Sequence, residues 1–158
     1  LEFNNLASAE IIDLAEYSFP LFEERLKKQQ NPLPGAVELA GKIRSADGVI
    51  IVTPEYNGGY PASLKNVVDL LTDEWRHKPV AISTVSDGPF GGTQVITSLQ
   101  FTLWKMGALT VPAMFPVPKV SEAFSEEGLP ADPEATGKRT ERFTGELLRC
   151  IEAFNQAE

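Results

Sequence analysis

Two short loops rich in glycine, proline and aromatic residues hold the groups best suited to binding a ligand. The first is TPEYNGGYP, residues 53–61, and the second is SDGPFGG, residues 86–92. Glycine and asparagine permit positive φ angles and a close approach of backbone to ligand, and several N–H groups of one such loop can point at one ligand. Each loop alone is also compatible with an ordinary turn. Together they favour a ligand held largely by backbone.

Side chains that usually perform covalent or metal chemistry are sparse. His77 is the only histidine and lies between Arg76 and Lys78, so we interpret it as a solvated turn residue. Cys150 is the only cysteine, and its apolar neighbourhood predicts a buried or half-buried thiol rather than a nucleophile. Ser86 lacks the GxSxG motif of a serine hydrolase. We therefore expect no catalytic side chain and no metal site.

The elements around the two loops alternate between strand and helix patterns. Residues 48–53 (GVIIVT) are apolar on both faces, which predicts a central parallel strand covered on both sides. The expected strands are residues 10–14, 48–53, 79–85 and 109–111, and the expected helices are 34–46, 61–71, 93–106 and 132–154, with a long irregular connection over 112–133. This alternation predicts an α/β fold with a doubly wound parallel sheet in three α/β/α layers. Ligands of such sheets bind at the carboxyl ends of strands, where both loops lie.

A family resemblance is carried by the same two loops. The string VTPEYNGGYPASLKNVVDLL, followed by KPVAISTVSDGPFGG, resembles the NADPH-dependent FMN reductase family, which includes quinone, azo-dye and chromate reductases. PEYNG followed by LKN is the most specific part, and weaker similarity near Phe19 and Phe124 extends it over the chain as one domain, residues 1–158. The resemblance implies a flavodoxin-like fold, FMN as the cofactor, and NADPH or NADH as the electron donor.

The resemblance also implies cofactor-binding residues in both loops. Those expected along the isoalloxazine ring and ribityl chain are Pro54, Glu55, Tyr56 and Asn57. Those expected at the pyrimidine end of the flavin are Ser86, Asp87, Gly88, Phe90 and Gly91. Because the flavin itself carries the electrons, the protein needs only to position and tune it.

One part of the family pattern is not visible. Family members begin with a strand and a GSxR-type loop for the FMN phosphate, whereas residues 1–4 here resemble the end of the helix that follows them. In a 2-1-3-4-5 sheet that strand is central, so we expect the intact protein to carry an additional N-terminal strand and phosphate loop. Without them FMN should bind weakly, because each charge-assisted hydrogen bond contributes ~1.5–3 kcal/mol.

The expected function is that of an FMN-dependent NAD(P)H oxidoreductase. Hydride would pass to the flavin, and electrons would then pass to a small-molecule acceptor, which is a quinone, an azo compound, a metal ion or free flavin. Two alternatives stay open: a flavodoxin-type electron carrier without an NAD(P)H site, and a degenerate family member that binds no flavin.

Composition restricts the partners. The 158 residues carry a net charge of -8, which disfavours a surface for nucleic acid. The longest aliphatic run, Val49 to Val52, is too short to span a bilayer. A single cysteine fits a reducing compartment, so we expect a cytoplasmic protein.

The helix expected over residues 93–106 has two apolar faces. The stripe expected to pack on the sheet consists of Val95, Ile96, Leu99, Leu103 and Met106. Phe101 and Trp104 fall on the opposite side, where a surface helix is normally polar. Exposed aromatic pairs are typical of interfaces, and the family resemblance also implies dimers. The pattern therefore predicts a homodimer or homotetramer through these two residues, unless the connection over 112–133 folds back over them.

Overall fold

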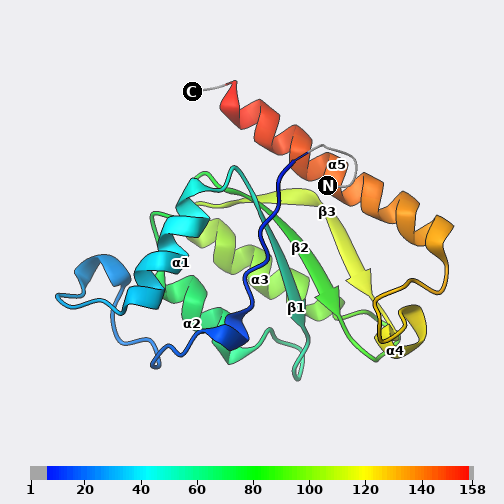
Figure 1. Cartoon of the computed structure of the whole chain (residues 1–158), viewed down its shortest axis with the longest axis horizontal. Coiled ribbons are helices and arrows are strands. Elements are labelled where there is room, and N and C mark those ends of the chain that lie inside the picture. Colours follow the sequence, from blue (N-terminus) through cyan, green and yellow to red (C-terminus); the bar gives the residue numbers. More distant parts are fainter. Residues whose placement is uncertain (1–6, 157–158) are drawn as a thin grey trace.

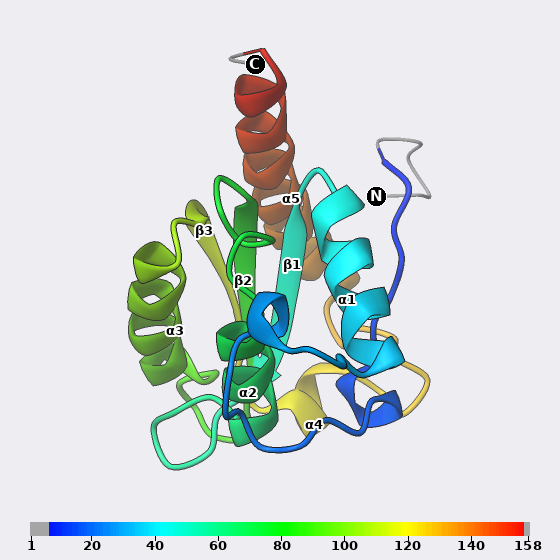
Figure 2. The same cartoon turned by 90° about the vertical axis from the view of Figure 1, so that its left-hand side faces the viewer.

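A computed structural model describes residues 7–156. Its centre is a parallel sheet of three strands in the order β1-β2-β3. The strands are β1 (Val49–Pro54), β2 (Pro79–Val85) and β3 (Leu109–Val117). The main helices are α1 (Pro34–Ser45), α2 (Ala62–Leu70), α3 (Thr93–Lys105) and α5 (Pro133–Asn155), and a short α4 (Val120–Ala123) follows β3. Figures 1 and 2 show α1, α2 and α3 on one face of the sheet and α5 on the other, which confirms the flavodoxin-like three-layer fold.

The apolar patterns of the sequence place the core correctly. Val80 and Ile82 of β2 pack with α1, α2 and α3 in the larger cluster, whereas Ala81 points to the opposite face and packs with Phe143 of α5. In α3 four residues of the predicted inner stripe are buried, namely Val95, Ile96, Leu99 and Leu103, and Leu99 is fully inaccessible to solvent. Met106, the fifth, is half-buried just after the end of the helix. Strand alternation and helical periodicity therefore determine which residues fill each layer.

The strand expected at residues 10–14 does not form. Leu14–Glu16 is instead a 3-10 turn, and the Asp13 carboxylate caps it by accepting a hydrogen bond from Ala15 N at 2.9 Å. Ile11 is 93% exposed. A strand needs a neighbour for its backbone groups, and no strand of residues 7–156 lies beside this segment. The sequence prediction was therefore wrong here, because hydrophobicity alone does not provide a pairing partner.

β3 is longer than predicted, since it continues through Pro112 and Pro116 to Val117. Proline is tolerated at the edge of a sheet, where its missing N–H leaves no ladder bond unmade. The β2–β3 register shifts between Val80 and Ile82, next to the segment that contains Pro112. The irregular connection expected over 112–133 is thus partly strand and partly the short helix α4.

The covering of β1 also differs from the prediction. In the described sheet β1 is an edge strand, paired on one side with β2. Ile50 packs against the α5 cluster, but Val52, two positions along on the same face, is 66% exposed. The reason is that α5 packs over β3 and β2 and does not extend over the far end of β1. The predicted helix end at residues 1–4 lies outside the described residues.

The two sides of α3 provide a test of this packing. We expect Leu99→Ala to lower the free energy of unfolding by about 2–5 kcal/mol, because it leaves a cavity at a fully buried position. Gln94→Ala, on the exposed side of the same helix, should change it by less than about 0.5 kcal/mol. Urea denaturation of both variants measures the difference, and similar losses would contradict the assignment of the inner face.

Candidate functional site

The two glycine-rich loops lie side by side at the carboxyl edge of the sheet. β1 and β2 are parallel neighbours, and Pro54 at the end of one is opposite Val85 at the end of the other. The loops that follow therefore begin next to each other, beyond the arrowheads of β1 and β2 in Figure 1. Their contact is close, because a Cβ atom built on Gly92 would lie 3.4 Å from Cβ of Glu55. The sheet thus joins two segments far apart in sequence into one surface.

The first loop is a tight turn with an exposed tip. Tyr56 N donates to the Gly59 carbonyl at 2.8 Å, and Gly59 N donates to the Tyr56 carbonyl at 3.0 Å. Between them Asn57 and Gly58 have φ angles of 52° and 78°, as expected for a type I′ turn. The Tyr56 side chain is 64% exposed. The turn therefore presents a tyrosine ring and an asparagine from a defined backbone.

The second loop is anchored from beneath by a buried threonine. Thr84, which is fully buried in β2, donates its hydroxyl to the Gly91 carbonyl at 2.6 Å. Gly91 and Gly92 have φ angles of 61° and 73°. A Cβ on Gly91 would lie 2.9 Å from Pro118 N, so only glycine fits there. Phe90, by contrast, is 77% exposed.

The segment after β3 supports the second loop from the side. Ser86 N donates to the Val117 carbonyl at 3.0 Å, Lys119 N donates to the Gly88 carbonyl at 3.1 Å, and Val120 N donates to the Ser86 carbonyl at 3.1 Å. These three hydrogen bonds fix the second loop against the segment that follows β3. No role was predicted for this segment from the sequence, because nothing in its composition indicates where it folds.

Both loops retain backbone donors. Over residues 7–156, the loop N–H groups without a protein acceptor include those of Asn57, Gly58, Asp87, Gly88 and Phe90. They come from both loops, so a bound molecule with several hydrogen-bond acceptors can engage more than one of them. The flavin ring carries such acceptors on its pyrimidine part. The residues present therefore fit a flavin ring. That Tyr56 and Phe90 both contact this ring in one pocket is a prediction.

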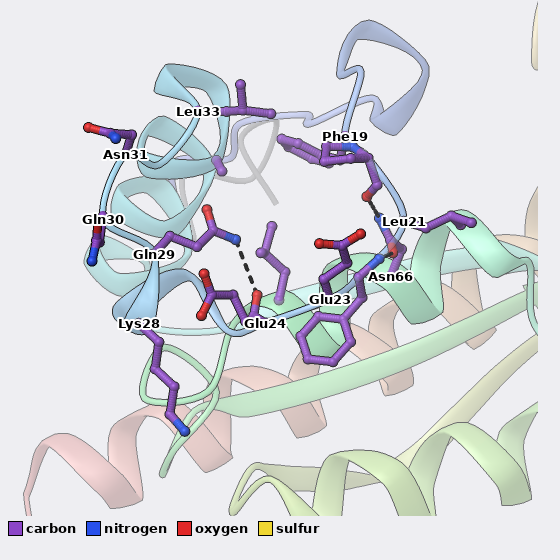
Figure 3. Close-up of a pocket in the computed structure, with 14 residues that line it drawn as sticks. Phe19, Leu21, Glu23, Glu24, Lys28, Gln29, Gln30, Asn31, Leu33 and Asn66 are labelled. Carbon is purple, nitrogen blue, oxygen red and sulfur yellow. Dashed lines mark hydrogen bonds between the residues drawn. The ribbon is translucent and has the colours of Figure 1, made fainter.

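Asn66 is a residue to which the sequence analysis gave no role. This α2 side chain accepts a hydrogen bond from Phe22 N at 2.6 Å and donates one to the Pro20 carbonyl at 2.8 Å. It therefore holds the segment that precedes α1 against α2. The sequence feature that could have indicated its importance was its position in the LKN motif. The same segment and α2 enclose a cavity of about 580 Å³, which Figure 3 shows lined by Phe19, Leu33 and Asn66 and which contains neither predicted loop.

No group of three or more His, Cys, Asp or Glu side chains that could hold a metal ion occurs between residues 7 and 156. His77 is exposed and has a φ angle of 60°, and Cys150 is half-buried on α5. None of the helices in this part of the chain is long and apolar enough to cross a membrane.

Comparison with known proteins identifies the family. Residues 2–122 match the model of the NADPH-dependent FMN reductase family. The chain belongs to this family. It is 35% identical over 104 residues to an NADPH azoreductase of Bacillus sp. (strain OY1-2), which covers 65% of this chain and 57% of that protein. It is 44% identical over 80 residues to a quinone reductase of Escherichia coli (strain K12), covering 48% and 42%.

A solved structure supports the fold of this FMN reductase family member. The flavoenzyme NAD(P)H:(acceptor) oxidoreductase FerB of Paracoccus denitrificans superposes with a TM-score of 0.77 at 24% identity, covering 95% of this chain and 83% of that one. This likeness shows the flavodoxin-like architecture. The chain spans about half the length of the curated relatives it matches.

A matched pair of glycine substitutions tests the packing of the second loop against β2. Gly58→Ala and Gly92→Ala both place a side chain at a positive φ angle, which costs ~1–2 kcal/mol. Only at Gly92 would the new Cβ also press on Cβ of Thr84, at 3.1 Å, because nothing lies within 4 Å at Gly58. We expect Gly92→Ala to lower the free energy of unfolding by at least about 1 kcal/mol more than Gly58→Ala. Equal losses in chemical denaturation would mean that Gly92 does not pack tightly against Thr84.

Proposed function

We propose that the protein is an FMN-dependent NAD(P)H oxidoreductase that reduces a small-molecule acceptor. The observation that carries this proposal is the pair of adjacent loops with unpaired backbone donors at the carboxyl edge of the sheet. Bound FMN would accept hydride from the nicotinamide and pass electrons on. The relatives named azoreductase and quinone reductase support an azo compound or a quinone as acceptor. A metal ion or free flavin would accept electrons by the same chemistry.

The proposed roles of the loop residues follow from their positions. Asn57 and Tyr56, on the first turn, would contact the ring and ribityl chain, with Pro54 and Glu55 at its base. The second loop would hold the pyrimidine end, through Ser86, Asp87, Gly88, Phe90 and Gly91. The exposed rings of Tyr56 and Phe90 would cover apolar parts of a bound flavin and exclude water from them.

The open edge of β1 supports a further proposal. Within the described residues β1 pairs on one side alone, and Val52 is exposed. We propose that another parallel strand of the intact protein occupies this edge and leads into the phosphate-binding loop. A strand there would satisfy the free backbone groups of β1. Weak FMN binding by residues 1–158 alone stays a prediction of this proposal.

Substitutions at the loop tips test the proposed function. When the protein is mixed with FMN and NADPH, we expect the flavin absorbance to bleach, which neither a pure electron carrier nor a member without flavin would cause.

Gly88→Val should weaken FMN affinity about tenfold, a loss of ~1.4 kcal/mol, because it fills space above the loop. A Cβ there meets no protein atom closer than 3.7 Å, so the fold should tolerate it. Asn57→Ala should also lower FMN-dependent NADPH oxidation.

The control for these variants is Gly145→Val in α5, where a new Cβ meets nothing within 4 Å. It should leave FMN affinity unchanged. Turnover at the wild-type level in both loop variants would contradict the site, and absence of bleaching by the wild-type protein would contradict the function.

Assembly is proposed from the outer face of α3. Phe101 and Trp104 are 62% and 64% exposed, and their ring centroids lie 5.8 Å apart. The connection after β3 does not cover them, so the fold-back alternative is wrong. Tyr60, at the end of the first loop, is hydrogen-bonded to Thr102 of α3 at 3.0 Å. A homodimer or homotetramer through this face would thus lie close to the proposed flavin site. The single cysteine supports a cytoplasmic location.

Trp104→Glu tests the assembly. We expect sedimentation of the wild-type protein at micromolar concentration to show a dimer or larger species, and the variant to be a monomer with lower activity. A charge in the centre of an interface is costly to bury, whereas it costs little on the exposed surface of a monomer. Thr140→Glu, which adds the same charge to the exposed side of α5, should stay assembled. A monomeric wild-type protein would contradict the proposal.

A further inference from the structure

Among residues 7–156, a hydroxyl group and no cation holds the Asp87 carboxylate. Ser121 of α4 donates its hydroxyl to Oδ1 of Asp87. The nearby Lys119 instead pairs with Glu122, with Nζ 3.1 Å from Oε2. In the part of the chain that the structure describes, Oδ2 of Asp87 receives no hydrogen bond. One oxygen is therefore anchored, and the other remains available as a charged acceptor.

The backbone fixes the geometry of this contact. Lys119 has a φ angle of 47°, an uncommon conformation for a residue with a side chain. The chain turns there into α4 (Figure 1). Ser121, the second residue of this helix, thereby reaches Asp87. Such a conformation costs ~1–3 kcal/mol and persists where surrounding contacts require it. Here those contacts are the hydrogen bonds that Lys119 N and Val120 N donate to the second loop.

We propose that Ser121 is a positioning residue that orients Asp87, so that its free oxygen accepts a hydrogen bond from an N–H group of the bound ligand. This inference rests on the proposed flavin site. In flavin the matching donor is the imide N–H of the pyrimidine ring. A carboxylate held in one orientation favours a ring with an N–H opposite its free oxygen over a ring that lacks this group. A ring without the N–H would displace the water bound to the carboxylate and would donate no hydrogen bond in its place. Ser121 would thus contribute to ligand selectivity without touching the ligand.

The test compares two variants of equal shape. Ser121→Val removes the hydroxyl, whereas Ser121→Thr retains it on a similar side chain. In the intact protein, we expect Ser121→Val to weaken FMN binding about fivefold, as for loss of one hydrogen bond, and Ser121→Thr to stay within about twofold of wild type. Glu122→Gln, which breaks the Lys119 ion pair on the same helix, is the control for a general disturbance of α4 and should bind FMN normally. Equal losses in the Val and Thr variants, or in the control, would overturn the proposal.

A methylated ligand separates positioning from stability. FMN methylated at the imide nitrogen has no N–H to donate. The wild-type protein should prefer FMN over the methylated form, and Ser121→Val should reduce this preference about fivefold. An unchanged preference would show that Ser121 does not act through Asp87 on the ligand.

Hydrogen exchange of the cofactor-free protein distinguishes this proposal from the proposed function. The amides of Ser86, Lys119 and Val120, which donate the hydrogen bonds between the second loop and the segment after β3, should exchange faster in Ser121→Val than in wild type, and at wild-type rates in Ser121→Thr. If the wild-type protein binds no FMN, the proposed function and the ligand contact both fail, while the exchange rates still report whether Ser121 anchors the loop. If FMN binds and the exchange rates of the Val and Thr variants agree, the positioning role alone fails.

Discussion

Parallel pairing of β1 with β2 is the constraint on which the candidate site depends. In a parallel sheet neighbouring strands end at the same edge, and the register places Pro54 opposite Val85. The two loops must therefore start beside each other, whatever their own sequences. Gly92 then lets the second loop pass close to β2, since a Cβ atom there would lie 3.1 Å from Cβ of Thr84, and the same Cβ would meet Glu55 at an ordinary contact distance of 3.4 Å. The site is thus a consequence of the sheet, and loop composition only adapts it to a ligand.

The loops are held in place by contacts that do not involve a ligand. The first is closed by the reciprocal hydrogen bonds of Tyr56 and Gly59, and the second is fixed from below by Thr84 and from the side by the segment leading into α4. Backbone donors kept in fixed positions bind a ligand without a large ordering cost. Loops of this kind would let a chain with few reactive side chains hold a cofactor that performs its own chemistry, as proposed above.

An element or contact could be predicted from the sequence where its cause lies in neighbouring residues of the chain. β2 and α3 follow from runs of apolar residues with the proper period, and β2 was predicted with its exact bounds. Residues 10–14 failed because strand formation requires a neighbour, which Ile11 does not have. β3 was predicted too short because Pro112 indicates a break unless the strand is known to lie at an edge. The support of Asp87 by Ser121 was not predictable, since it joins residues 34 positions apart by a contact that no spacing encodes.

The charges at the site indicate which end of FMN it would hold. Glu55 is half-buried and Asp87 is exposed, so each loop places a carboxylate at this edge. A doubly charged phosphate next to them would be repelled, because like charges within a Debye length of about 8 Å interact at physiological ionic strength. The oxidised flavin ring is neutral and offers both acceptors for the free N–H groups and an N–H for a carboxylate. The two described loops therefore suit the ring, and the phosphate requires a separate set of donors, such as a helix start, away from these acids. That separation agrees with the open edge of β1, where a further strand and its loop would bring those donors from the other side.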